Sequence, residues 1–397
     1  MTLRVPKQIT VVGGGLAGLV AAVAAAEGGA PVVLHEAHRE LGGRARALPP
    51  PYVAHEGPHA FYADGPHWTW LAERDLLGPV SRLGLREVRR GRLRWQGQLR
   101  ALPPLAMTRM LMHRSLRAPV DQDFHTWAGP RFGPEATRAA ANALGVATYD
   151  HDPGRLSAAF VWDLLLRVTA PRPPAVRFVL GGWPRLVERL RARAERLGVR
   201  IETGSRVVTL PEPPVIVATQ LEAARGLLDE PDLSWESGRT VLLDLGLRAQ
   251  PGDLFNVLDM DEAGYVARFS EPDPSVAPAG HSLLQATMPV RPGESRAAAL
   301  TRLERFVELG FPGWRNRVDW RRDGLATGRS GALDLPGYTW RDRPAIDRGG
   351  GVYLAGDLVA APGIRAEVSI NSGLAAARAA LQHAGLPVGA GEPGRRG

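Results

Sequence analysis

Residues 9–18 of the 397-residue chain read Ile-Thr-Val-Val-Gly-Gly-Gly-Leu-Ala-Gly. The β-branched run 9–12 predicts a strand, and residues 16–26 predict a helix of small residues directly after the glycines. Residues 31–35 predict a second strand, which ends at Glu36. Strand, glycines, helix, strand and acid together predict the βαβ unit of a dinucleotide-binding domain.

Each part of this unit has a physical role in holding a dinucleotide. Gly13 permits a tight turn, Gly15 lets a pyrophosphate approach the backbone, and Gly18 allows the helix to pack closely on the strand. The helix N-terminus presents unpaired N–H groups and a positive dipole end to the phosphates. Glu36 can accept hydrogen bonds from both ribose hydroxyls, which disfavours a 2′-phosphate.

Composition excludes several kinds of chemistry. The chain has no cysteine, which excludes disulfides, thiolate metal sites, cysteine nucleophiles and thioether-linked cofactors. Lys7 is the only lysine, which excludes Schiff-base chemistry and a P-loop lysine. The formal charge of +8 is carried by arginines mixed with Ala, Gly and Pro. We expect no nucleic-acid partner, because no aromatic-and-basic motif accompanies this charge.

Further motifs lie near both ends of the chain. Leu41-Gly42-Gly43-Arg44 follows Glu36 closely, and residues 351–357 predict a strand that runs into Gly356-Asp357, before a helix within 364–381. With these pieces the chain resembles the superfamily of flavin-containing amine oxidases, phytoene desaturases and protoporphyrinogen oxidases. Segments 181–186, 198–201 and 214–219 also fit the central region of that superfamily.

The resemblance implies an α/β fold, with a Rossmann-type FAD-binding domain and an inserted α+β substrate domain. The FAD-binding domain is expected from residues 1–88, 177–238 and 331–384. The substrate domain is expected from residues 89–176 and 239–330, and residues 385–397 are expected to form a flexible tail. Within the substrate domain we predict a hairpin at 92–102, helices near 105–116, 135–143, 156–166 and 295–309, and strands near 241–247, 265–269 and 282–287.

The resemblance also assigns roles to single residues. Arg44 would lie along the FAD diphosphate, Val207 would bind adenine through its backbone from a strand position, and Asp357 would bind the ribityl or phosphate edge. The N–H groups at the start of the last helix would point at flavin N1 and O2. The full predicted cofactor-binding set is Gly13, Gly15, Leu16, Ala17, Gly18, Glu36, Gly43, Arg44, Val207, Gly356, Asp357, Glu367 and Val368. Because cysteine is absent, the FAD is expected to be non-covalent.

The segment His55-Glu56-Gly57-Pro58-His59 formally matches a zinc-binding pattern. That pattern needs a helix, which Gly57 and Pro58 oppose, so we predict no metal site. The segment also resembles the loop that passes the flavin in desaturase-like relatives, and His59 is the candidate catalytic residue there. A surface histidine is the open alternative. His59→Ala is expected to slow flavin reduction ~10²- to 10⁴-fold for an acid–base role and about tenfold for a positional role.

We expect an FAD-dependent oxidoreductase of the desaturase-like branch, which removes a hydride from an apolar or amphipathic small molecule and forms a C=C or C=N bond. Many amine oxidases of the superfamily place a lysine beside flavin N5. The only lysine here, Lys7, precedes the first strand and cannot take that position, which counts against an amine oxidase without excluding it. An amine or amino-acid oxidase, a flavin-dependent isomerase and a non-enzymatic flavin-binding protein remain alternatives. No stretch reaches the ~18 apolar residues of a membrane span. We expect a cytoplasmic protein; peripheral membrane contact and oligomeric state stay open.

Overall fold

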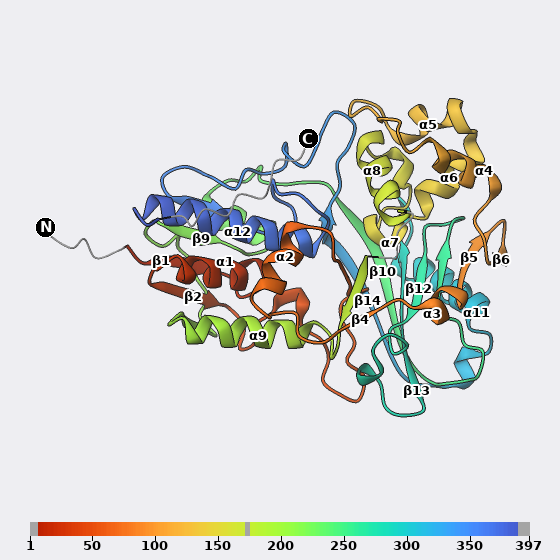
Figure 1. The fold of residues 1–397 in the computed structure, drawn as a ribbon, viewed down its shortest axis with the longest axis horizontal. Helices are drawn as coiled ribbons and strands as arrows, with labels where there is room; N and C mark the ends of the chain where they lie inside the picture. Colours follow the sequence, from red (N-terminus) through yellow and green to blue (C-terminus); the bar gives the residue numbers. More distant parts are fainter. Residues whose placement is uncertain (1–6, 171–174, 388–397) are drawn as a thin grey trace, which may run out of the picture.

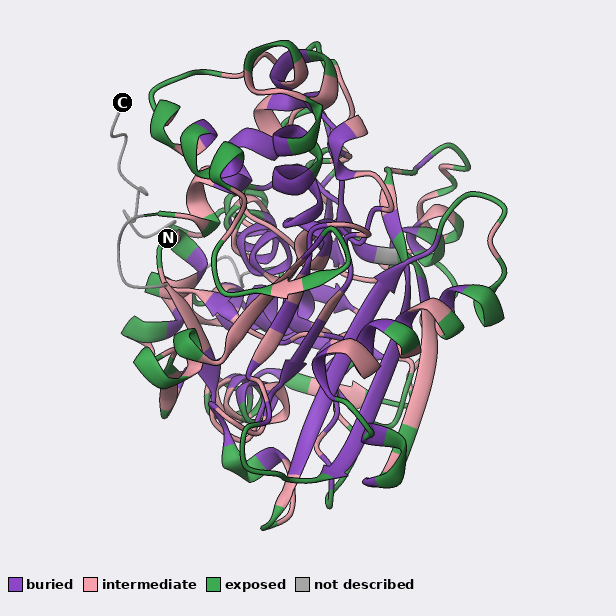
Figure 2. Ribbon diagram, turned by 90° about the vertical axis from the view of Figure 1, so that its right-hand side faces the viewer, coloured by how far each residue is buried: buried purple, intermediate pink, exposed green. Residues whose placement is uncertain are grey.

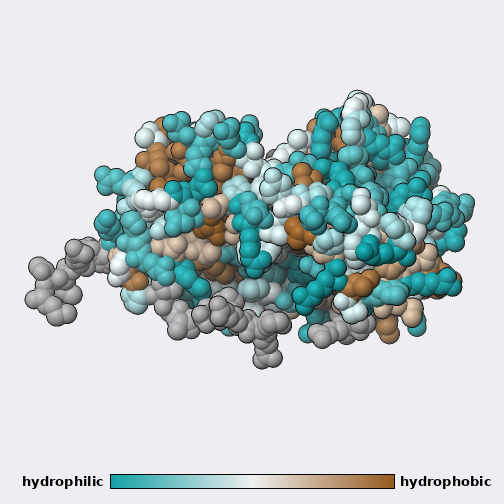
Figure 3. Space-filling view, turned by 90° about the horizontal axis from the view of Figure 1, so that it is seen from above, coloured by the Kyte–Doolittle hydropathy of each residue, from teal (hydrophilic) through white to brown (hydrophobic). Residues whose placement is uncertain are grey.

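The computed structural model describes residues 7–170 and 175–387. Most of the predicted flexible tail, residues 388–397, lies outside the described residues. Figure 1 shows two lobes, and Figure 3 shows from above an indentation in the outline where they meet. One lobe contains a parallel sheet, and the other contains a larger mixed sheet with a group of helices beside it.

A five-stranded parallel sheet forms the first lobe, in the order β15-β9-β1-β2-β8. Its strands are β1 (Ile9–Val12), β2 (Val32–Glu36), β8 (Arg200–Thr203), β9 (Val215–Val217) and β15 (Val352–Leu354). All four strand pairings are parallel. Short runs of Val and Ile suit such strands, because helices and loops cover both faces of the sheet. The predicted Rossmann-type βαβ unit is confirmed.

Three helices lie side by side against this sheet (Figure 1): α1 (Leu16–Glu27), α9 (Trp183–Arg196) and α12 (Ala366–His383). Glycines allow the close packing of α1. A Cβ on Gly18 would overlap the carbonyl oxygen of Gly13, and a Cβ on Gly373 would lie 2.5 Å from the carbonyl oxygen of Ala17. The role predicted for Gly18 in helix–strand packing therefore has a direct geometric reason.

The second lobe is built on a seven-stranded sheet in the order β14-β10-β13-β12-β11-β5-β6. Its strands are β5 (Gly91–Trp95), β6 (Gln98–Arg100), β10 (Ser237–Arg248), β11 (Asn256–Asp259), β12 (Tyr265–Arg268), β13 (His281–Pro289) and β14 (Val318–Ala332). Only the β11–β5 pairing is parallel. Helix α11 (Arg296–Gly310) packs on β10 and β13. Figure 2 shows the long strands of this sheet as largely buried.

Helices from residues 105–168 form a separate apolar core beside the seven-stranded sheet. They are α4 (Leu105–Met110), α5 (Phe124–Phe132), α6 (Pro134–Asn142), α7 (Gly145–Thr148) and α8 (Ala158–Val168). Phe124 and Trp162 are fully buried in this core. The other elements are α2 (Pro66–Glu73), α3 (Leu85–Arg89), α10 (Leu221–Leu228) and a three-stranded sheet of β3 (Phe61–Tyr62), β7 (Val176–Val179) and β4 (Val80–Arg82). The domain boundaries remain a prediction.

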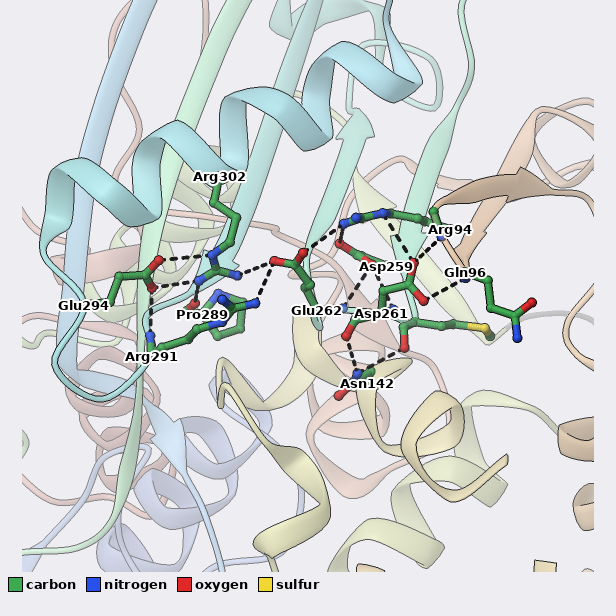
Figure 4. A network of polar contacts seen from close by, with 12 residues as sticks. Arg94, Gln96, Asn142, Asp259, Asp261, Glu262, Pro289, Arg291, Glu294 and Arg302 are labelled. Carbon is green, nitrogen blue, oxygen red and sulfur yellow. Dashed lines mark hydrogen bonds and ion pairs between the residues drawn. The ribbon is translucent and has the colours of Figure 1, made fainter. Parts of the chain in front are cut away.

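A polar network fixes these helices to the sheet (Figure 4). Asn142 of α6 donates from Nδ2 to the carbonyl oxygens of Met260 and Asp261, at 3.0 Å each. Arg94 of β5 pairs with the fully buried Asp259 at 2.9 Å. Burial raises the pKa of Asp259 to about 6, against the opposing charge of Arg94. The loop after β11 thus joins the helices and the sheet edge through hydrogen bonds and ion pairs.

Within residues 7–170 and 175–387, no helix is both long enough and apolar enough to cross a membrane.

Candidate functional site

The glycines after β1 adjoin the second pair of glycines at 42–43. Gly13 has φ +108°, a conformation that favours glycine. The Gly42 N–H donates to the Gly14 carbonyl at 2.7 Å, which holds the two loops together. A Cβ on Gly15 would meet no atom within 4 Å, so the chain leaves free space beside this backbone. Six predicted cofactor residues gather here: Gly13, Gly15, Leu16, Ala17, Gly18 and Gly43.

Glu36 lies at the end of β2 with its carboxylate directed at the first glycine loop. Its Oε2 accepts the Gly14 N–H at 2.7 Å, and its Oε1 accepts the His38 N–H at 2.8 Å. The side chain is 7% exposed. Each carboxylate oxygen keeps a further lone pair. The two backbone bonds therefore fix the carboxylate in place and leave it able to accept further hydrogen bonds.

Arg44 and Asp357 join the two ends of the chain. Arg44 donates from Nη1 and Nη2 to the two carboxylate oxygens of Asp357, at 2.7 and 2.6 Å. Burial would raise the pKa of Asp357, but the charge and hydrogen bonds of Arg44 hold that pKa below its ordinary value. Gly356 donates its N–H to Ser372 Oγ at 3.0 Å. Arg44 thus neutralises Asp357 across the two ends of the chain, and its contact with a diphosphate stays a prediction.

The start of α12 differs in one detail from the prediction. The Glu367 N–H donates to the Ile364 carbonyl at 3.0 Å, so this N–H already has an acceptor within the chain. The Glu367 carboxylate accepts the Ile364 N–H at 3.1 Å and two hydrogen bonds from Arg167, each 2.9 Å. Glu367 therefore fixes the turn before α12 through its side chain, while Val368 is fully buried one residue later.

Val207 does not lie in a strand. The structure places it in the irregular segment between β8 and β9, and it is partly buried against the apolar cluster beside β9. The expected strand position of Val207 is wrong, because β8 ends at Thr203. Its backbone contact with adenine stays a prediction.

His59 is buried in a stack of rings. It is 2% exposed, with ring centroids 3.6 Å from His55 and 4.4 Å from Phe269. A surface histidine, one of the two open interpretations, is therefore wrong. The segment 55–59 is not helical. Burial lowers the pKa of His59 to about 3, so the imidazole is neutral near pH 7 and is a weak base.

Arg365 and a group of tyrosines were not predicted from the sequence. Arg365 precedes α12 with φ +50°, and its Cζ lies 3.8 Å from the centroid of the Tyr149 ring. Its Nε and Nη2 atoms are buried, and no described residue accepts a hydrogen bond from them. Burial raises the pKa of Tyr149, and it raises that of Tyr62 to about 12. The only sequence signal was an arginine directly before the last helix.

Three buried carboxylates of this region, Asp244, Asp357 and Glu367, are paired with arginines. Asp244 Oδ2 accepts a hydrogen bond from Arg322 Nε at 2.8 Å, and Gln285 donates to the other oxygen at 3.0 Å. Glu367 is paired with Arg167, in the same way as Asp357 with Arg44. Arg365 is the cation here with buried donor atoms that no described residue satisfies.

Two family profiles match the chain in separate segments. An "NAD(P)-binding Rossmann-like domain" profile matches residues 11–74, and a "Flavin containing amine oxidoreductase" profile matches residues 239–381. The chain belongs to the flavin-containing amine oxidoreductase superfamily. The resemblance noted from the sequence is confirmed, and this flavoprotein is an FAD-dependent oxidoreductase. Non-covalent attachment of its FAD stays a prediction.

Solved structures share the whole fold of this flavoprotein. An oxidoreductase from Methanosarcina mazei is 16% identical with a TM-score of 0.76, over 93% of this chain and 99% of that one. Cyclohexylamine oxidase from Brevibacterium oxydans is 15% identical with a TM-score of 0.72, over 95% and 99%. A UDP-galactopyranose mutase is 14% identical with a TM-score of 0.66, over 95% and 96%. No curated protein matches by sequence. At these identities the similarity establishes the fold alone.

The residues of the flavoprotein fit the group that its superfamily binds. The space beside Gly15 would admit a pyrophosphate at the N-terminus of α1, and the fixed carboxylate of Glu36 would accept the ribose hydroxyls. Arg44 would face the diphosphate from the second glycine loop. The space beside Gly15 is the observation that supports this fit, because no atom of the chain lies within 4 Å of the position that a Cβ would take there.

The burial of His59 predicts a pH-dependent stability. Its pKa of about 3 in the folded chain lies below the ordinary 6.5, so the unfolded chain binds more protons between these values and stability falls as the pH falls. From pH 7 to pH 5 this group costs about 2 kcal/mol. His59→Phe keeps a ring in the stack. Urea unfolding at both pH values is expected to show the wild type losing about 2 kcal/mol more than the variant; equal losses would contradict the burial.

Proposed function

We propose that this flavoprotein removes a hydride from an apolar or amphipathic small molecule that is neutral or anionic, and forms a C=C or C=N bond in it. The observation that carries the proposal is the charge arrangement before α12. Arg365 has two buried donor atoms without an acceptor, whereas Asp244, Asp357 and Glu367 are each paired with another arginine. A cationic amine would meet Arg365 without a free carboxylate to balance its charge.

The surroundings of Arg365 support an apolar or amphipathic substrate. Tyr149 stacks under the guanidinium, and Tyr62 and Tyr265 lie close enough to influence one another electrostatically. Burial raises the pKa of all three phenols, so they are neutral near pH 7. Aromatic faces with one cation suit a molecule that has an apolar body and an anionic or polar end.

The chain has to orient and shield the substrate, and needs little acid–base chemistry. FAD supplies the hydride acceptor when it is bound. The tyrosines and Arg365 would orient the reacting C–H bond of the substrate toward the hydride acceptor and exclude water. His59 is neutral and sandwiched between rings, which favours the positional role considered for it. His59→Ala is then expected to slow flavin reduction about tenfold, and not by a factor of thousands.

An amino-acid oxidase is the second candidate, because a substrate carboxylate would also pair with Arg365. The only lysine, Lys7, is exposed and precedes β1. A lysine beside the flavin is therefore not available to either candidate. Peroxide formation in air with an amino acid would favour this second function.

Anaerobic reduction of the flavin tests the proposal. Wild type and Arg365→Gln are mixed with matched compounds that carry a carboxylate, a neutral amide or an ammonium at one end, and the flavin band is followed. Arg365→Gln is expected to weaken binding of the carboxylates about tenfold to 100-fold and to leave the amides unchanged. Arg305→Gln, on the exposed side of α11, is the control. Fastest reduction by ammonium compounds, equal in both proteins, would contradict the proposal.

A further inference from the structure

The net positive charge of the chain is concentrated in one segment. Residues 88–120 contain no Asp or Glu, and they contain eight arginines: Arg89, Arg90, Arg92, Arg94, Arg100, Arg109, Arg114 and Arg117. The whole chain has a formal charge of +8, so acidic and basic residues balance in the remainder. Residues 88–120 therefore carry the whole of the net positive charge of the chain.

The same segment exposes large apolar side chains. Leu102 is 76% exposed, Leu105 64% and Met112 79%. Leu105 and Met112 are seven residues apart across α4 and the 3-10 turn that follows it (Leu111–His113), so they lie on one face. Met107 and Met110 are buried on the opposite face, in the helical core. The helix is thus anchored by one apolar face while a second apolar face remains uncovered.

Exposed arginines lie in the same segment as these apolar residues. Arg100, Arg109 and Arg117 are exposed, and among the described residues the structure records no acidic partner for them. Arg94 differs, since it is held in the network of Figure 4. Strand β6 and α4 lie at the right-hand edge of Figure 1, the side that faces the viewer in Figure 2. We name Arg100, Leu102, Leu105, Arg109, Met112 and Arg117 the α4 face.

We propose that the α4 face docks on an anionic membrane surface. Leu102, Leu105 and Met112 would enter the boundary between headgroups and acyl chains, and the arginines would contact the anionic headgroups. Charge complementarity selects this occupant. A second copy of the chain would bring two like-charged faces together, which is unfavourable. Docking here would hold the enzyme where apolar molecules partition, but the proposal stands whatever the substrate is.

Vesicle sedimentation of the FAD-loaded protein tests the proposal. One set of vesicles is pure phosphatidylcholine, and the other contains phosphatidylglycerol in addition. Wild type is expected to bind the anionic vesicles, to bind more weakly in high salt, and to bind phosphatidylcholine far less. The triple variant Arg100→Gln, Arg109→Gln, Arg117→Gln is expected to bind about 100-fold more weakly. The triple variant Leu102→Ser, Leu105→Ser, Met112→Ser is expected to bind at least about tenfold more weakly.

Val208→Ser is the matched control, because Val208 is also 79% exposed but lies outside the α4 face. Its binding is expected to equal that of the wild type. Flavin absorbance and melting temperature, expected to be unchanged in all variants, show that the fold survives. Absence of binding to anionic vesicles, or binding that both triple variants retain, would overturn the proposal. A concentration-dependent dimer that the triple variants abolish, without vesicle binding, would also overturn it and assign the face to self-association.

Discussion

Gly15→Val is expected to produce a folded protein that has lost its FAD. Gly15 has φ −75° and ψ −174°, a conformation open to any residue, and a Cβ there meets no atom of the chain within 4 Å. The Cβ that the substitution adds therefore contacts no atom of the apoprotein. A valine would occupy the space where the pyrophosphate approaches the backbone. We expect FAD affinity to fall at least about 100-fold, which corresponds to about 2.7 kcal/mol.

Two glycine variants make this result specific. Gly226→Val in α10 also places its Cβ in open space and is expected to keep FAD. Gly18→Ala is expected to destabilise the fold itself, because its Cβ overlaps the Gly13 carbonyl oxygen. Flavin absorbance after gel filtration, with circular dichroism of the same samples, separates the three outcomes. Full FAD occupancy in Gly15→Val would show that the cofactor does not lie against this loop.

Arg44→Ala is expected to lower both stability and FAD occupancy. It removes the cation from Asp357, whose side chain is 10% exposed. Breaking such a pair typically costs 3–5 kcal/mol when both partners are buried. Because the Arg44 side chain is 33% exposed, we expect about 3 kcal/mol in the apoprotein. The diphosphate would also lose a neutralising charge.

A double-mutant cycle checks the origin of this loss. Asp357→Asn in the Arg44→Ala background removes the uncompensated carboxylate, so the double variant is expected to be more stable than the sum of the single effects. Arg191→Ala is the control, since its pair with Glu195 is exposed on α9 and should contribute less than about 1 kcal/mol. Strict additivity at Arg44 and Asp357 would contradict the coupling seen in the structure.

The cofactor half of the fold could be predicted because its signals are local. The strand, glycines, helix and acid of residues 9–36 follow one another directly, and each has one backbone role. The hairpin β5–β6 and helices α6, α8 and α11 were also expected near their observed bounds. Strand β14 was not expected, although it spans Val318–Ala332. Its central residues include arginines and glycines, and its conformation depends on pairing with the distant β10.

The proposed substrate side of the site could not be predicted either, because tertiary contacts form it. Arg365, Tyr149 and Tyr62 come from three distant parts of the chain, and no motif connects them. His59 was noticed in the sequence, but its stacking between His55 and Phe269 depends on the fold. Burial decides its protonation state, and burial is not visible in a loop sequence. The motifs therefore predict the cofactor, whereas the proposed substrate site depends on tertiary contacts.

The identity and attachment of the released cofactor decide whether this chain binds FAD non-covalently. The purified protein is denatured with heat or acid, the chain is removed, and the supernatant is analysed by chromatography against FAD, FMN and NAD standards. The chain has no cysteine, and Glu36 and the glycine loops suit an adenosine and a pyrophosphate. We therefore expect intact FAD in solution and a colourless chain. FMN, NAD, or flavin that stays attached to the denatured chain would contradict it.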